Sequence, residues 1–247
     1  MHIIKHWNFF TIQLNKLLLF LFPPKCLKCN AVTSRNGTLC ATCWKKIKFI
    51  SEPLCKICGF PFEFDVGKDL ICTNCIKNKP FFDHAISLFE YNEHSKNLIH
   101  KFKYGDKTYF SRYFAEWLYK RIGVNIGSYE YIIPVPLHRT RMRQRFYNQS
   151  SLLAKDLGKL AGLKFLPNAL IKTRYDVPQT SLPKNQRLKN VKNSFIINQQ
   201  YKEEIKNSKI ILVDDVYTTG STINECSKIL KKHKCYEITA LTLARIC

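Results

Sequence analysis

A strand-like run that ends in two acids and a hydroxyl-rich turn constrains this fold more than any other feature. Residues 209–222 read KIILVDDVYTTGST, and helix-like periodicity follows over residues 222–232. A turn that joins a strand to a helix leaves backbone N–H groups unpaired at the helix N-terminus, where the helix dipole favours an anion. The segment therefore predicts an open α/β sheet with an anion site and two carboxylates at the carboxyl end of one strand.

The turn suits a phosphate, and the acids before it suit sugar hydroxyls or Mg²⁺. Gly220 lets the backbone approach a phosphate closely, and the hydroxyl side chains around it add donors. Carboxylates are poor phosphate ligands, but they accept hydrogen bonds from hydroxyls and coordinate Mg²⁺ directly or through water. The candidate sugar-phosphate site comprises Asp214, Asp215, Thr218, Thr219, Gly220, Ser221 and Thr222.

Other interpretations of this segment fit less well. A solvated turn with Ser221 or Thr222 as the helix N-cap is the simplest alternative. A P-loop is disfavoured because no Gly-Lys-Ser/Thr follows the turn, and the sequence lacks the G-x-G-x-x-G fingerprint of dinucleotide-binding folds.

Strand-like and helix-like segments alternate through the C-terminal two thirds of the chain. Apolar runs predict strands over residues 85–91, 131–136, 209–215 and 237–243, with a further strand over residues 191–197. Helical periodicity occurs over residues 96–103, 110–121, 150–161 and 222–232. This alternation predicts a Rossmann-like, mostly parallel sheet that helices cover on both faces.

Eight of the eleven cysteines fall in four CxxC pairs, a spacing typical of tetrahedral zinc sites. The pairs are Cys26/Cys29, Cys40/Cys43, Cys55/Cys58 and Cys72/Cys75. We expect two structural Zn²⁺ ions that are needed for folding, with sequential or interleaved pairing of the four motifs both open. Disulfides are disfavoured by the lack of an export signal, and a thioredoxin-like role fits one CxxC rather than four.

The first 24 residues are apolar and aromatic and end at Pro23-Pro24. Their uninterrupted apolar run is too short to cross a bilayer, so they predict an amphipathic helix packed on the protein rather than an integral membrane span. We expect a cytoplasmic protein with three parts: this helix (1–24), a double zinc-ribbon module (25–80) and an α/β domain (81–247).

The chain is strongly basic, with 40 Lys and Arg against 18 Asp and Glu, which favours polyanionic partners. Four arginines alternate after the second predicted strand: Arg139, Arg141, Arg143 and Arg145. A loop there would lie on the same rim as the acid pair and suit a pyrophosphate or nucleic acid, whereas a solvated basic loop is the alternative. A polar, proline-interrupted loop over residues 172–191 supplies further candidates: Arg174, Gln179, Arg187 and Asn190.

LVDDVYTTGST resembles the loop of type I phosphoribosyltransferases that binds 5-phosphoribosyl-1-pyrophosphate (PRPP). Together with the CxxC pairs, Lys103-Tyr104, PVPLHR and the terminal Ala244-Arg245, the segment makes the chain similar to the ComF (competence protein F) family over about residues 20–247. The resemblance implies a type I phosphoribosyltransferase domain behind a zinc-ribbon module. It also implies that the two acids bind the ribose hydroxyls, that the turn holds the 5′-phosphate, and that Mg²⁺ accompanies PRPP.

One segment departs from the family pattern. Where the family usually reads Arg-Gly-Phe-Asn-Gln, this chain reads Arg145-Phe146-Tyr147-Asn148-Gln149. Losing the glycine changes which backbone conformations the segment adopts easily, and this bears on loop geometry rather than on the fold.

The resemblance implies a role in DNA uptake and natural transformation, with intracellular handling of single-stranded DNA. The arginines with Phe146 and Tyr147 would contact DNA by backbone pairing and base stacking. The zinc module would dock a helicase or another DNA-uptake protein. The alternative is an active phosphoribosyltransferase of nucleobase salvage; no residue stands out as a general acid or base, and both the transfer chemistry and its acceptor are left open.

Overall fold

The computed structural model of this chain describes residues 19–64, 67, 70–105, 107–174 and 193–247. It divides into two compact units, Met1–Ile47 and Lys48–Cys247. The division falls between the second and third CxxC pairs, whereas the boundary at residue 80 groups all four pairs in one module. The domain limits expected from the sequence therefore stay a prediction.

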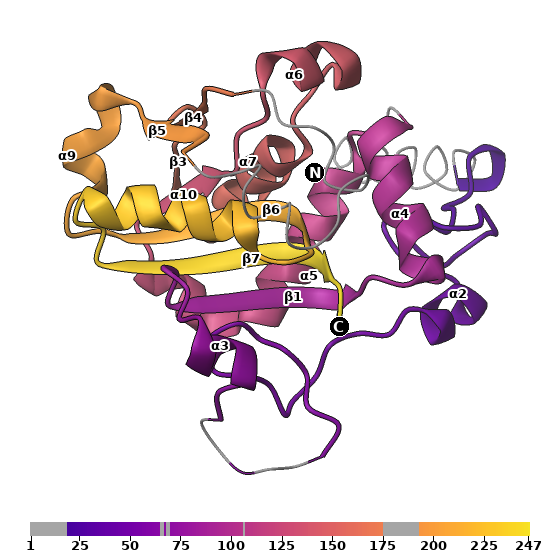
Figure 1. The fold of residues 1–247 in the computed structure, drawn as a ribbon. Coiled ribbons are helices and arrows are strands. Elements are labelled where there is room, and N and C mark those ends of the chain that lie inside the picture. Colours follow the sequence, from indigo (N-terminus) through magenta and orange to yellow (C-terminus); the bar gives the residue numbers. More distant parts are fainter. Residues whose placement is uncertain (1–18, 65–66, 68–69, 106, 175–192) are drawn as a thin grey trace, which may run out of the picture. The chain divides into compact units, whose positions relative to one another are not determined.

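A five-stranded parallel sheet forms the centre of the Lys48–Cys247 unit (Figure 1). Its strands follow the order β1-β7-β6-β2-β3. Their bounds are His84–Glu90 (β1), Glu237–Arg245 (β7), Lys209–Tyr217 (β6), Tyr131–Pro134 (β2) and Lys164–Phe165 (β3). The two long central strands, β6 and β7, are near-continuous buried runs, as expected for strands that are covered on both faces.

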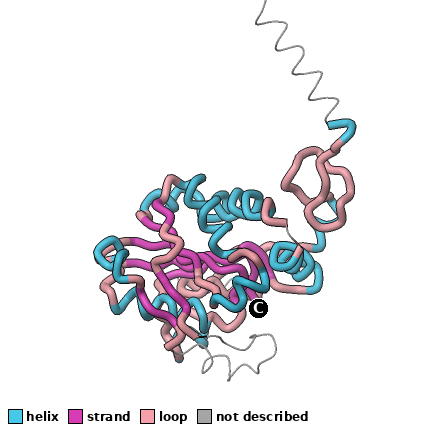
Figure 2. The backbone as a smooth tube through the Cα atoms, turned by 90° about the horizontal axis from the view of Figure 1, so that it is seen from above, coloured by secondary structure: helices cyan, strands magenta, loops and turns pink. Residues whose placement is uncertain are grey.

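Helices cover both faces of this sheet (Figures 1 and 2). The helix α5 (Phe110–Ile122) packs on α7 (Gln149–Ala161), and α10 (Ser221–Lys232) covers the opposite face, as right-handed crossovers require. The helix α4 (Glu93–Tyr104) follows β1. The shorter elements are α2 (Ala41–Lys46), α3 (Thr73–Lys77), η1 (Gly123–Ser128), α6 (Arg139–Arg145), β4 (Leu170–Lys172), β5 (Phe195–Ile197), η3 (Gln199–Tyr201) and α9 (Lys202–Ile205).

Capping residues determine where the helices α4 and α7 begin, at the carboxyl end of the sheet. Asn92 and Ser95 form a reciprocal capping box at the start of α4. Asn148 caps α7 by accepting a hydrogen bond from the Ser150 N–H, and α7 ends at Gly162 in the left-handed conformation. These signals fix where α4 and α7 begin, and so place residues of both helices beside the carboxyl ends of the strands.

The mostly parallel α/β fold expected from the sequence is confirmed. Each of the strands expected over residues 85–91, 131–136, 209–215 and 237–243 overlaps an observed strand, and each expected helix overlaps α4, α5, α7 or α10. The strand expected over residues 191–197 is β5, which begins at Phe195; residues 191 and 192 lie outside the described part. The loop expected for the alternating arginines is wrong, because this segment forms the helix α6.

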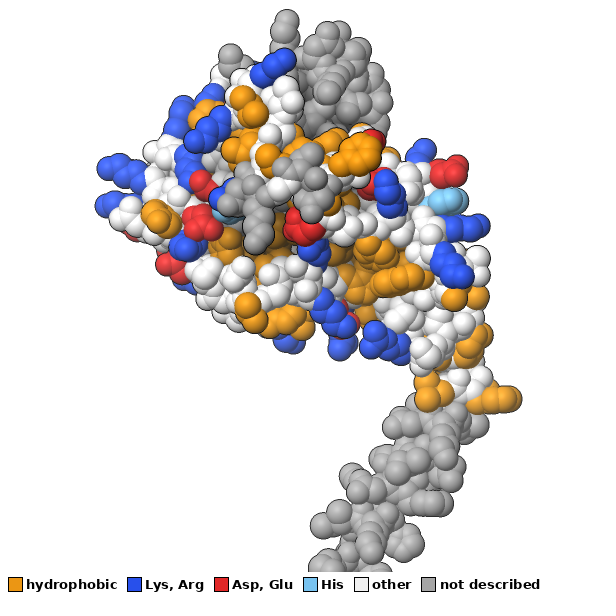
Figure 3. Space-filling view, turned by 90° about the horizontal axis from the view of Figure 1, so that it is seen from below, with side chains coloured by type: hydrophobic (Ala, Val, Ile, Leu, Met, Phe, Trp, Pro, Cys, Tyr) orange, Lys and Arg blue, Asp and Glu red, His pale blue; other side chains and the backbone are white. Residues whose placement is uncertain are grey.

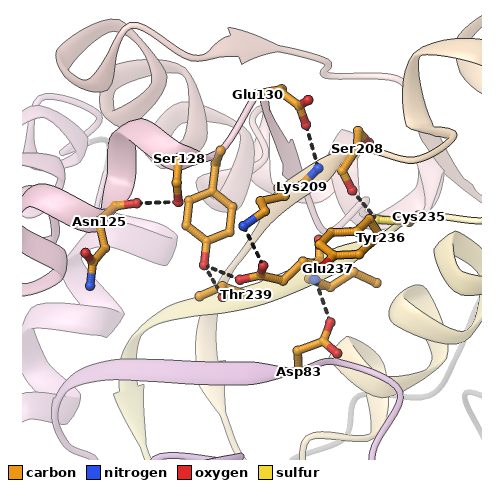
Figure 4. A network of polar contacts seen from close by, with 12 residues as sticks. Asp83, Asn125, Ser128, Glu130, Ser208, Lys209, Cys235, Tyr236, Glu237 and Thr239 are labelled. Atoms are coloured by element: carbon orange, nitrogen blue, oxygen red, sulfur yellow. Dashed lines mark hydrogen bonds and ion pairs between the residues drawn. The ribbon is translucent and has the colours of Figure 1, made fainter.

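A polar network joins the amino ends of the strands, opposite the end where the acid pair lies (Figure 4). Glu130 accepts a hydrogen bond from the Lys209 backbone N–H at 2.6 Å, and the Lys209 ammonium pairs with Glu237 at 3.0 Å. Asp83 accepts hydrogen bonds from the Ile238 N–H and from the Lys231 ammonium, each at 2.8 Å. These contacts hold β1, β6 and β7 in register, so we assign this end of the sheet a structural role.

The helix expected over residues 1–24 lies mostly outside the described residues. Residues 19–21 are helical, and Leu19, Phe20 and Leu21 are exposed. Among the residues that the structure describes, no helix is both long and apolar enough to span a bilayer. Lys and Arg side chains are scattered over the face of the molecule seen in Figure 3, with hydrophobic side chains between them.

Candidate functional site

A pocket of about 590 Å³ lies at the carboxyl ends of β2 and β6 in the Lys48–Cys247 unit. The end of β6, the turn after it and the start of α10 form one side. Residues of α4, of α6 and of the segment after β2 form the other sides. The carboxyl edge of a parallel sheet is where open α/β folds bind their ligands, so this pocket is the candidate site.

Asp214 and Asp215 both line the pocket, in different environments. Asp214 is half-buried and accepts hydrogen bonds from the Ser150 hydroxyl at 3.1 Å and from the Asp215 N–H at 2.9 Å. Burial and the neighbouring Asp215 carboxylate raise the pKa of Asp214 to about 7. Asp215 instead pairs with the Lys103 ammonium at 2.8 Å. The pair therefore offers one acid that keeps a proton close to neutral pH and one that is paired with a lysine.

The raised pKa of Asp214 predicts a pH dependence of stability. The folded protein holds this proton up to about pH 7, whereas the unfolded chain loses it near 3.8. Between these values the unfolded state binds fewer protons, so the free energy of unfolding falls as pH rises. We expect the wild type to lose stability relative to Asp214→Asn over this interval. Denaturant unfolding of both proteins from pH 4 to 8 measures the difference, and a difference independent of pH contradicts the assignment.

The turn after β6 and the N-terminus of α10 line the pocket. Gly220 adopts the left-handed conformation at φ 73° and is the N-cap of α10, where no side-chain capping bond forms. The hydroxyls of Thr219 and Ser221 bond to each other at 2.6 Å, and Thr218, Gly220, Ser221 and Thr222 line the pocket. The alternative with Ser221 or Thr222 as N-cap is therefore wrong. The arrangement suits an anion at the start of α10.

The helical form of the arginine segment sorts its side chains into two sets. Residues four apart lie on one helix face, whereas residues two apart point in different directions. Arg141 and Arg145 line the pocket, and Arg139 and Arg143 are exposed outside it. Arg145 donates a hydrogen bond to the Tyr104 hydroxyl at 2.7 Å, and its guanidinium lies 4.7 Å from the centre of that ring. The sequence gives no reason to separate the four arginines, whereas the structure places two of them in the pocket that the acid pair lines.

The residue that departs from the family pattern is in a strained conformation. Phe146 ends α6 at φ 62°, in the left-handed region that suits glycine, and its side chain is 86% exposed. Tyr147 is half-buried, and its hydroxyl donates to the Phe102 carbonyl at 2.9 Å. Of the two aromatic residues expected to stack on bases, Phe146 is the one that faces solvent.

We expect Phe146→Gly to stabilise the fold by about 0.5–1 kcal/mol. The exposed ring loses little burial, and relief of left-handed strain outweighs the greater entropy of glycine in the unfolded chain. Phe146→Ala is the matched control, because alanine keeps the Cβ and hence the strain. Denaturant midpoints of the three proteins check this, and equal effects of the Gly and Ala variants contradict it.

Several pocket residues were missed by reasoning from the sequence. Lys103 pairs with Asp215, Ser150 bonds to Asp214, and Lys172 on β4 also lines the pocket. Lys103 belongs to the Lys103-Tyr104 pair, which contributed to the family resemblance but did not indicate a role for the lysine. Of the candidates over residues 172–191, Arg174 is exposed and does not line the pocket, whereas Gln179, Arg187 and Asn190 lie outside the described residues.

The cysteines form two separate tetrads by sequential pairing of the CxxC motifs. Each brings four sulfur atoms within 4.8 Å of one another, which fits a tetrahedral Zn²⁺ site. The first tetrad, in the Met1–Ile47 unit, comprises Cys26, Cys29, Cys40 and Cys43, and the second, in the Lys48–Cys247 unit, comprises Cys55, Cys58, Cys72 and Cys75.

Both tetrads share one local design. In each tetrad, the backbone N–H of the third cysteine donates a hydrogen bond to the sulfur of the first cysteine at 3.3 Å. Cys40 donates to Cys26 in the first tetrad, and Cys72 donates to Cys55 in the second. Burial opposes ionisation of Cys26 and Cys55, but hydrogen bonds from backbone N–H groups outweigh this effect and lower the pKa of Cys26 to about 6 and of Cys55 to about 7. Burial instead raises the pKa of Cys43 to about 12 and of Cys58 to about 11, and it also raises that of Cys75. The zinc assignment therefore depends on the geometry of the four sulfurs. The residues therefore fit two structural zinc ions.

Two family models match the chain in the order that this architecture suggests. A double zinc ribbon domain matches residues 17–76, and a phosphoribosyl transferase domain matches residues 162–245. The fold and the matches thus define a phosphoribosyltransferase-type α/β protein with zinc-ribbon cysteine sites.

Full-length relatives narrow this class to one family. "Competence protein F" of Haemophilus influenzae is 35% identical over 90% of this chain and 96% of its own length. "DNA utilization protein YhgH" of Escherichia coli K12 is 26% identical over 84% of this chain and 90% of its own length. "Competence protein ComFC" of Bacillus subtilis is 25% identical, with 89% and 94% covered. The chain belongs to the competence protein F family.

Proposed function

We propose that this protein binds the ribose 5-phosphate part of PRPP, or of a related ribose phosphate, in the pocket at the end of β6. The observation that supports this most is the convergence of Asp214 and Asp215 with the uncapped N-terminus of α10 in one pocket. The acids would accept hydrogen bonds from ribose hydroxyls. The turn Thr218–Thr222 would hold the 5′-phosphate. Within this turn, Thr219 would support Ser221 through the hydrogen bond between their hydroxyls.

The pocket also has cations for a second phosphate group. Arg141 and Arg145 would neutralise the pyrophosphate of PRPP, together with a Mg²⁺ ion that the ligand brings. Lys103 pairs with Asp215, and ribose hydroxyls that engage Asp215 would turn this ammonium toward the ligand phosphates. Titration calorimetry with PRPP and Mg²⁺ tests the proposal. Saturable binding with one ligand per chain is expected, and absence of binding overturns it.

We further propose that the protein acts in DNA uptake in the cytoplasm, on single-stranded DNA during natural transformation. Relatives carry the names "Competence protein F" and "DNA utilization protein", and the chain has 40 basic against 18 acidic residues. Arg139, Arg143 and Phe146 are exposed together along α6, outside the pocket lining. Basic side chains beside an exposed ring suit a single strand, because stacking is independent of base sequence. A helicase or another DNA-uptake protein is the proposed partner of the zinc-ribbon region.

We expect Arg139→Ala with Arg143→Ala to weaken binding of a single-stranded oligonucleotide and to leave PRPP binding intact. Loss of two phosphate contacts reduces the slope of log affinity against log salt by about 1.4. The matched control is Arg141→Ala with Arg145→Ala, which removes the same charge from the pocket face and should weaken PRPP binding more. Fluorescence anisotropy across a salt series checks this, and a DNA loss confined to the control pair contradicts it.

The alternative function is phosphoribosyl transfer onto a nucleobase in salvage. The rings of His100 and Tyr104, 4.8 Å apart at the pocket, offer a surface on which a base could stack. Pyrophosphate release from PRPP in the presence of each common base would establish this activity. Its absence together with PRPP binding favours a binding role over an enzyme.

A further inference from the structure

Arg245, near the carboxyl end of β7, is a buried cation whose neighbours are unusual. It is 3% exposed, and it donates a hydrogen bond from Nη1 to the Cys58 carbonyl. Its guanidinium lies 4.8 Å from the centre of the Tyr217 ring and 5.3 Å from that of Phe60. Among the described residues it forms no ion pair with a carboxylate, and its Nε has no hydrogen-bond partner.

A buried guanidinium needs a compensating negative charge, because it stays protonated and its desolvation is costly. Two groups beside it could supply that charge: the sulfurs of the second tetrad, to which Cys58 belongs, and the Cys247 thiol, which interacts with the Arg245 side chain. Burial raises the pKa of the Cys247 thiol, which leaves the tetrad as the main source. Four thiolates around one Zn²⁺ carry a net charge of about −2. Arg245 is therefore placed to neutralise the metal-loaded tetrad, while the two rings cover its remaining faces by cation–π contact.

The same arginine packs on the residue that supports the phosphate-binding turn. Tyr217, the last residue of β6, is 8% exposed, and its ring meets Phe82 edge-on at 6.3 Å. Its hydroxyl lies directly against Gly220, since a Cβ added there would come within 2.3 Å of this oxygen. The ring is thus held by Arg245, by Phe82 and by the turn itself, and the left-handed Gly220 leaves room for it.

A continuous packed path therefore leads from the second tetrad to the turn. Cys58, Phe82 and Tyr217 belong to one buried cluster with the core of the sheet. All of these residues lie in the Lys48–Cys247 unit, whereas the first tetrad lies in the Met1–Ile47 unit. The two metal sites are alike in local geometry, and the second is tied to the pocket by contacts within its own unit.

We propose that Arg245 and Tyr217 are positioning residues that couple the second metal site, and not the first, to the phosphate-binding turn. Metal at Cys55, Cys58, Cys72 and Cys75 fixes Arg245, which fixes the Tyr217 ring, which in turn holds Gly220 in the conformation that receives a phosphate. Tight binding of ribose 5-phosphate therefore depends on metal at this site. The inference rests on the proposed function of the pocket.

The first test compares affinities for ribose 5-phosphate, measured by calorimetry. Arg245→Met keeps the length of the side chain but removes its charge, and we expect the Kd to rise tenfold or more, with partial rescue in Arg245→Lys. The matched control is Lys231→Met, which removes a cation from the opposite end of the sheet and should lower the unfolding midpoint without changing the Kd. A Kd in Arg245→Met equal to that of the wild type overturns the coupling alone, whereas no binding by the wild type overturns the proposed function.

The second test uses reciprocity in the unmodified protein. If zinc at the second site strengthens ligand binding, then ligand must strengthen zinc binding there by the same factor. We expect saturating ribose 5-phosphate to shift the equilibrium chelator midpoint of one of the two zinc ions by tenfold or more and to leave the other unchanged. Equal shifts of both ions, or of neither, contradict the proposal. This readout does not depend on whether any variant folds.

Discussion

We expect Cys58→Ser to lower the midpoint of thermal unfolding by about 10 °C or more, whereas Cys29→Ser leaves the unfolding of the Lys48–Cys247 unit nearly unchanged. Cys58 is 4% exposed and packs in the same buried cluster as the sheet and α10, so loss of its metal site disturbs the main core. Cys29 is exposed and belongs to the other unit. Structural zinc sites contribute binding free energy directly to folding.

Differential scanning calorimetry of the two variants, with zinc counted in each, checks this prediction. Each variant should retain one tightly bound zinc ion, which separates loss of a metal from general misfolding. A strong chelator added to the wild type should reproduce the sum of the two effects. Equal shifts for Cys29→Ser and Cys58→Ser would show that the second tetrad is no more part of the core than the first.

The second large effect concerns the acid pair. In the wild type, PRPP with Mg²⁺ at a hundred times its Kd adds about 2.7 kcal/mol to the free energy of unfolding, a rise in midpoint of about 5–10 °C. Replacing Asp214 and Asp215 together by Asn is expected to remove most of this rise. Asparagine keeps the shape of each side chain but lacks the charge that strengthens hydrogen bonds from hydroxyls and holds Mg²⁺.

The variant without ligand should remain folded, because Asp214 already keeps its proton to about pH 7 and Asn mimics that state. Asp83→Asn serves as the control, since Asp83 is a carboxylate at the amino ends of the strands, away from the pocket. Thermal shifts with and without ligand compare the three proteins. A full ligand shift in the double variant would place the ligand elsewhere.

The sequence predicts the α/β fold well because its strongest signals are local. The apolar runs of β6 and β7 and the periodicity of α7 and α10 each lie within about a dozen residues. The spacing of each CxxC motif likewise determines a local turn. The pairing of the tetrads needed the structure. Sequential and interleaved arrangements use the same turns and differ only in how the chain between them folds.

Residues of the site could be predicted from the sequence only where they are adjacent in one short segment. The acids and the turn are contiguous, and the structure brings them together in one pocket. The four arginines were expected in a loop, but α6 turns every second residue to a different side, so that Arg141 and Arg145 separate from Arg139 and Arg143.

The remaining contacts join residues far apart in the chain. Lys103 reaches Asp215 from α4, and Arg245 reaches Cys58 from β7. Neither partner carries a local signal of the other, because an isolated lysine or arginine reads as part of a solvated surface in a chain with 40 basic residues. Such contacts follow from the register of the strands, which the sequence leaves open.

Ribose-phosphate recognition at the end of β6 is the central claim, and a crystal structure with PRPP and Mg²⁺ tests it most directly. We predict that the ribose hydroxyls contact Asp214 and Asp215, that the 5′-phosphate lies against Thr218–Thr222, and that each cysteine tetrad holds one zinc ion. A PRPP molecule bound away from the acid pair, or a pocket that stays empty at saturating ligand, would contradict the account.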